Sequence, residues 1–109
     1  MNISNTKAQM RKGILELCVL NIVSHGEVYP SDIMKELKAV QLIVVEGTLY
    51  PLLTRLKNAD LLTYTWKESQ GGPPRKYFTL TDLGNSFLKE LQGSWKELNA
   101  AVNNILKTK

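Results

Sequence analysis

The stretch Glu46-Gly-Thr-Leu-Tyr-Pro-Leu-Leu-Thr-Arg-Leu-Lys57 decides the fold, together with Gln70-Gly-Gly-Pro-Pro-Arg-Lys-Tyr-Phe-Thr79 a little further along the chain. The first stretch predicts a helix with one apolar face, because its leucines follow the i, i+3, i+4, i+7 spacing: Leu49, Leu52, Leu53 and Leu56. In the second, a Gly-Gly-Pro-Pro turn lies between segments rich in β-branched and aromatic residues, which predicts a β-hairpin with a longer loop and a basic tip.

We expect this third helix to run from about Gly47 to Ala59. Pro51 would remove a backbone hydrogen bond if it lay in the middle of the helix, at a cost of about 3 kcal/mol. Two arrangements avoid or absorb that cost. Either Thr48 is the N-cap, so that Pro51 falls in the first turn, or the helix has a local kink at the proline.

Two helices are expected before this stretch. From Lys7 to about Ser24 the apolar residues nearly encircle a helix, which therefore needs cover on more than one side and indicates a partner subunit. A second helix opens at Pro30, where proline is tolerated in the first turn. Residues 41–45 form either a small strand or an extended connector.

After the hairpin, residues 81–107 predict a long last helix that Thr79 or Thr81 caps. Its apolar residues step by 3 and 4 in the manner of a heptad seam: Leu88, Leu91, Trp95, Leu98, Val102 and Ile105. We expect this seam to join two copies of the chain. The alternative is an amphipathic helix that folds back onto its own core.

The predicted fold class is mainly α with a β-hairpin. Residues 1–109 form one domain, in which a winged helix-turn-helix at 5–80 precedes a C-terminal dimerisation helix at 81–107. A helix followed by a hairpin in this order is how a winged helix meets a DNA duplex. The net charge of +4 suits an anionic partner without proving one.

Composition excludes other classes. The apolar stretches are too short to cross a bilayer, and Met1-Asn-Ile-Ser does not open a secretory leader. The one cysteine, Cys18, has no disulfide partner, so we expect a cytoplasmic protein with no membrane contact. Because the sequence offers no nucleophile–base pair, metal-ligand cluster or glycine-rich phosphate loop, we expect no catalysis, metal or cofactor.

These stretches resemble the PadR family of bacterial transcriptional regulators. The matching segments are Glu46-Gly-Thr-Leu-Tyr-Pro-Leu-Leu53, Arg55-Leu56, Leu61-Leu62 and Gln70 to Gly84. A single C-terminal helix with Trp95 is similar to the short branch, which includes multidrug-sensing members. The resemblance implies a dimeric repressor that binds a palindromic operator in double-stranded DNA and responds to a small aromatic compound. The Gly-Gly-Pro-Pro tip departs from relatives with an extra basic residue there.

In this interpretation the helix from Thr48 onward enters the major groove. Its expected contacts are hydroxyls on phosphates or bases, an arginine on guanine or phosphate, a lysine on phosphate and a proline on a thymine methyl: Thr48, Tyr50, Thr54, Arg55, Lys57 and Pro51. Arg75 and Lys76 would neutralise the backbone beside the groove, with Gly72 and Pro73 near the minor groove. Ser31 would donate to a phosphate. The alternative is that Arg55 and Lys57 only solvate a surface helix.

The two tryptophans have different expected roles. Trp95 belongs to the seam and, in a dimer, would flank a flat slot for an aromatic effector, although packing alone also explains it. Trp66 is expected to be structural. Two other functions stay open: a winged-helix module for protein contacts without operator recognition, and a small enzyme, for which the sequence shows no convergent polar pocket.

Overall fold

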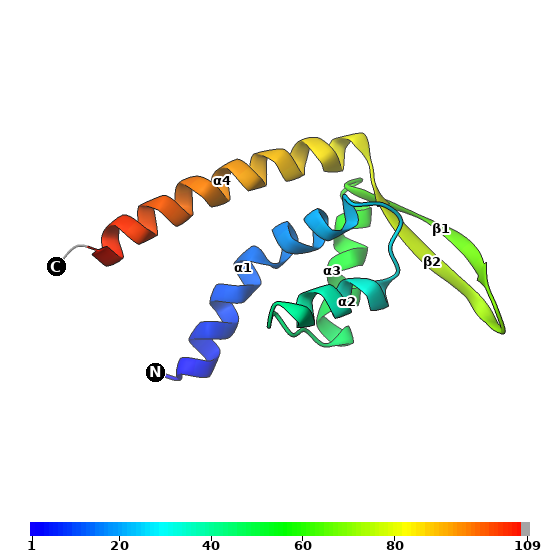
Figure 1. Ribbon diagram of the computed structural model, residues 1–109, viewed down its shortest axis with the longest axis horizontal. Coiled ribbons are helices and arrows are strands. Elements are labelled where there is room, and N and C mark those ends of the chain that lie inside the picture. Colours follow the sequence, from blue (N-terminus) through cyan, green and yellow to red (C-terminus); the bar gives the residue numbers. More distant parts are fainter. Residues whose placement is uncertain (108–109) are drawn as a thin grey trace.

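The computed structural model describes residues 1–107 and confirms a mainly α fold with one β-hairpin. Three helices form its body: α1 (Ile3–Val23), α2 (Pro30–Ala39) and α3 (Glu46–Asn58). The hairpin of β1 (Leu62–Ser69) and β2 (Gly72–Leu80) projects from this body, and α4 (Asp82–Lys107) runs away on the other side (Figure 1). The molecule is therefore elongated, with extents of 58 × 32 × 22 Å.

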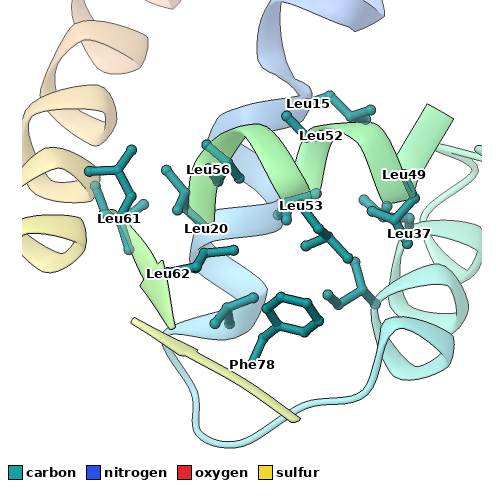
Figure 2. Close-up of a cluster of buried hydrophobic side chains, with 14 residues drawn as sticks. Leu15, Leu20, Leu37, Leu49, Leu52, Leu53, Leu56, Leu61, Leu62 and Phe78 are labelled. Atoms are coloured by element: carbon teal, nitrogen blue, oxygen red, sulfur yellow. The ribbon is translucent and has the colours of Figure 1, made fainter. Parts of the chain in front are cut away.

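The core lies where α1, α2 and α3 meet the base of the hairpin and the start of α4 (Figure 2). All four leucines of the predicted α3 stripe are buried in it: Leu49, Leu52, Leu53 and Leu56. Leu62 and Phe78 close it from the hairpin and Leu88 from α4. Because one face of α3 is committed to this core, its opposite face stays on the surface.

The first helix begins at Ile3, earlier than the predicted Lys7, because the Asn2 side chain caps it and accepts a hydrogen bond from the Ser4 N–H at 2.8 Å. Its buried residues start only at Leu15. Residues 1–13 are all exposed. Half of α1 therefore extends beyond the core of its own chain.

The second helix starts at Pro30, as predicted. The Asp32 carboxylate accepts a hydrogen bond from the Tyr29 N–H at 3.0 Å and so closes its first turn. Residues 42–45 that follow it are an extended connector rather than a strand, with Leu42 and Val44 half-buried. This connector leads directly into α3.

The prediction that Thr48 caps α3 is wrong. The helix begins at Glu46 after the N-cap Val45, so Pro51 is its sixth residue and lies beyond the first turn. The proline therefore removes the N–H that would donate to the Gly47 carbonyl. Its ring is on the exposed face, where water can satisfy that carbonyl.

The expected longer hairpin loop is also wrong. The strands continue to a tight turn at Gln70 and Gly71, and Gly71 has a φ of +73°, which a glycine adopts readily. Pro73 and Pro74 belong to β2, at the point where its pairing with Lys67 to Ser69 of β1 shifts register. Prolines cannot donate a hydrogen bond to the ladder. A bulge tolerates them because its extra residue is not paired with the other strand.

The last helix is capped by Thr81, one of the two predicted caps, whose Oγ1 accepts a hydrogen bond from the Gly84 N–H at 2.9 Å. The Thr81 hydroxyl also donates to the Asp60 carbonyl at 2.6 Å, and the Thr81 N–H donates to the Leu61 carbonyl at 3.1 Å. Thr81 thus fixes the direction in which α4 leaves the body.

Candidate nucleic-acid interface

A notch of about 480 Å³ separates α3 from the hairpin, or wing. Five of the predicted DNA-binding residues meet there: Ser31, Tyr50, Thr54, Arg75 and Lys76. They come from α2, α3 and β2. The two basic residues of β2 lie beside α3, because this strand runs past the side of the helix. Among residues 1–107, no acidic side chain lines this notch.

Trp66, which was expected to be structural, also lines the notch. Its side chain is 61% exposed. It lies opposite Lys76 on the strand face that begins in the core with Leu62 and Tyr64. The Lys76 ammonium is 4.4 Å from the Tyr64 ring centroid and 5.3 Å from that of Trp66. The alternation of side chains along β1 was the signal that could have placed Trp66 beside the basic residues.

The base of the wing is attached to the start of α2. The rings of Tyr29 and Tyr77 lie 3.8 Å apart between centroids, and the Arg75 guanidinium is 5.1 Å from the Tyr29 ring. The hydrogen bond with Tyr29 raises the pKa of Tyr77 to about 12, with desolvation adding to the effect. A tyrosine is already neutral at physiological pH with its ordinary pKa, so this shift does not change the charge beside Arg75.

The outward face of α3 is lined by Tyr50, Pro51, Thr54, Arg55 and Asn58. Asn58 was not among the predicted contacts, although helical spacing places it on this face. Arg55 does not project freely, because its Nη2 forms an ion pair with the Glu16 carboxylate at 3.0 Å. Both side chains are partly exposed, at 63% and 39%.

Four predicted contacts lie apart from both the notch and the outward face of α3. Thr48 faces the other flank of α3, toward α1. The Lys57 ammonium is 5.9 Å from the Tyr64 ring at the far end of the helix. Gly72 and Pro73 lie by the turn at the hairpin tip. All four are exposed, and their roles stay predictions.

A second hollow, of about 610 Å³, lies between α1, the end of α2 and α4. Trp95 lines it together with apolar side chains of α1, and Asn21 and Gln92 join α1 to α4 by a hydrogen bond of 2.8 Å. Cys18 is half-buried in the wall, and burial raises the pKa of its thiol. We call this hollow the α1–α4 groove.

The predicted seam on α4 divides at Trp95. Leu88 is buried and Leu91 half-buried against the core of the same chain, which matches the fold-back alternative for the first turns. Beyond them the seam residues are exposed: Trp95 41%, Leu98 57%, Val102 46% and Ile105 74%. Trp95 lines the α1–α4 groove, whereas Leu98, Val102 and Ile105 keep about half or more of their surface exposed.

The family comparison agrees with this geometry. The model of the "Transcriptional regulator PadR-like family" matches residues 19–90, from near the end of α1 through the wing and into α4. The chain belongs to the PadR-like family of transcriptional regulators. The resemblance of the motifs in α3 and the wing is thereby confirmed.

Solved PadR-like structures share the whole fold. A PadR-like transcription factor from Bacteroides fragilis is 62% identical, with 93% of this chain and 98% of that chain covered and a TM-score of 0.78. A PadR-like regulator from Bacillus cereus is 41% identical over 93% and 99% of the two chains, with a TM-score of 0.84. Their lengths match, so the single long α4 is shared.

Bacillus subtilis PadR, solved in complex with operator DNA, has the same fold at 23% identity and a TM-score of 0.67. The match covers 72% of this chain and 46% of that protein.

In this PadR-like chain, no helix within residues 1–107 is long and apolar enough to cross a membrane. Nor do the described His, Cys, Asp and Glu side chains form a group that could hold a metal ion.

Proposed function

We propose that this PadR-like protein is a sequence-specific transcriptional repressor that binds a palindromic operator as a homodimer and is released by a small aromatic or hydrophobic effector. One observation carries the DNA-binding part of the proposal. The exposed face of α3 and the basic wing meet at one notch, whose described lining has two cations and no acid.

Three features of the surface suit a duplex. The width of a helix matches the major groove, so the exposed face of α3 can present Tyr50, Thr54 and Arg55 to base edges. Arg75 and Lys76 then lie beside α3, where they would neutralise phosphates and set the orientation of the helix. Trp66 adds an exposed flat apolar surface that can pack on a deoxyribose.

The dimer is supported by the exposed part of the α4 seam. An apolar stripe from Trp95 to Ile105 that its own chain leaves uncovered is typical of a helix that packs on a second copy. A two-fold dimer would place two α3 helices toward successive major grooves, about 34 Å apart, which explains why a palindrome would be the target.

Arg55→Ala is expected to weaken operator binding by about 1–2 kcal/mol. This is the lower part of the range for an arginine that reads a base, because Arg55 must first give up its ion pair with Glu16. The measurement is a titration of labelled operator by fluorescence anisotropy, alongside a scrambled duplex of the same length. Operator affinity equal to that of the unmodified protein would remove Arg55 from the contact surface.

Glu16→Gln is the matched control for this variant. It breaks the same ion pair but leaves the guanidinium in place, so operator affinity should be kept or slightly raised. If both substitutions weakened binding equally, the ion pair would act by holding α1 against α3 rather than by supplying a DNA contact.

The effector part of the proposal rests on the α1–α4 groove. A flat ligand against Trp95 would separate α1 from α4, whose contact includes the Asn21–Gln92 hydrogen bond. Because α4 also carries the seam, a ligand that binds better to one dimer geometry shifts the population toward it and away from the spacing of the operator.

A Trp66→Phe variant, in which Trp95 is the sole tryptophan, is expected to show quenched fluorescence with planar hydrophobic dyes. Quenching should saturate, and Trp95→Ala should abolish dye binding. The same dye should raise the protein concentration needed to bind operator. A dye panel that leaves both Trp95 fluorescence and operator binding unchanged would contradict the effector role.

A further inference from the structure

Basic residues lie on the flank of α3 that faces away from the wing. Arg11 and Lys12, in the third turn of α1, line a hollow with Thr48, which belongs to the first turn of α3. The wing residues Arg75 and Lys76 lie beside Tyr50 and Thr54, on the other flank. The exposed face of α3 is therefore bordered by cations on both sides.

The charge of this end of α1 is of one sign. Residues 1–15 contain Lys7, Arg11 and Lys12 and no acidic residue. The first acid in the chain, Glu16, is already paired with Arg55 of α3. Arg11 and Lys12 are both exposed, so their charges face water and are free to meet an anionic surface.

Arg11 and Lys12 do not belong to the apolar stripe that leads to the α1–α4 groove. That stripe follows helical spacing through Met10, Ile14 and Leu17, and Leu17 lines the groove with Trp95. Ala8, Arg11, Lys12 and Leu15 line the hollow on the α3 side instead. A second copy packed on the groove side would leave these cations uncovered.

We propose that Arg11 and Lys12 form a second phosphate-binding flank, which contacts the DNA backbone on the side of α3 opposite the wing. The inference rests on the proposed function, because α3 must first enter the groove. A helix in a major groove has a phosphate strand on each side, so one basic flank serves each strand. The contact is with the backbone and therefore carries no sequence information.

The test is the salt dependence of DNA binding for the full chain with R11Q/K12Q, in which glutamine keeps the helix propensity of both positions. Each lost phosphate contact makes the slope of log K against log salt shallower by about 0.9. We expect a reduction of about 2 per bound protomer, with affinities for operator and scrambled duplex falling by the same factor. The matched control is K89Q/K107Q, which removes the same charge from exposed positions on α4.

Three outcomes would overturn the inference. Equal slopes for R11Q/K12Q and the unmodified protein would do so, provided that the unmodified protein still prefers its operator. An equal change in K89Q/K107Q would mean that net charge alone is responsible. A lower mass of R11Q/K12Q in sedimentation would show that this face holds a second copy instead. If the unmodified protein bound operator and scrambled duplex equally well, the proposed function itself would be overturned.

Discussion

Replacing Gly84 by alanine is expected to destabilise the protein by about 2–3 kcal/mol, a large part of the stability of a small domain. A Cβ at this position would lie 2.0 Å from the Leu61 carbonyl oxygen and 2.9 Å from the carbonyl carbon. Neither atom can move aside freely, because the same carbonyl accepts the hydrogen bond from the Thr81 N–H that starts α4. The substitution must therefore push α4 away from the core.

Urea denaturation at a fixed protein concentration measures this effect. The matched control is Gly93→Ala, on the same helix, where an added Cβ meets no atom within 4 Å. That substitution should raise the free energy of unfolding by about 0.5–1 kcal/mol, because alanine favours helix. If the two variants had the same stability, the close approach of α4 to Leu61 would not hold in solution.

Placing two glutamates on the exposed seam, as Leu98→Glu with Val102→Glu, is expected to give a monomer. Both side chains are large and about half exposed in the isolated chain, at 57% and 46%, so the substitution leaves the core of each protomer intact. Two charges buried in an apolar helix contact cannot be solvated there. Operator affinity should then fall by about 10²-fold to 10⁴-fold, because each half-site must be bound separately.

Sedimentation measures the loss of the dimer, and operator titration measures the loss of affinity. The control is Ala100→Glu with Asn103→Glu, which adds the same charge to the other face of α4. It should stay dimeric and bind normally apart from the small effect of added negative charge. A dimeric Leu98→Glu/Val102→Glu protein with unchanged affinity would contradict the role of α4 in assembly.

Elements with a strong local pattern could be predicted from the sequence. The leucine spacing located α3 and its buried face, Pro30 located the start of α2, and Thr81 was one of two expected caps for α4. The prediction that Thr48 caps α3 was wrong because the helix begins directly after the connector, at the N-cap Val45, which makes no side-chain cap. The prediction of a longer hairpin loop was wrong because a bulge lets the prolines continue the strand. Composition alone does not reveal such a bulge.

The candidate site was predicted less completely. The sequence indicated which side chains of α3 and the wing are exposed, but not which of them meet, since that depends on how the hairpin leaves the core. The ion pair that joins Arg55 to Glu16 became visible only in three dimensions. Contacts between residues 39 positions apart have no local signal in the chain.

The most direct test of the central claim is fluorescence anisotropy of the protein with the DNA upstream of its own gene and with a scrambled duplex, near physiological salt. A preference of about 10³-fold or more for the upstream DNA is the predicted result, because base edges read by α3 add to the phosphate contacts of the wing. Equal and strongly salt-dependent affinity for both duplexes would contradict it, since only a sequence-blind basic surface would then remain.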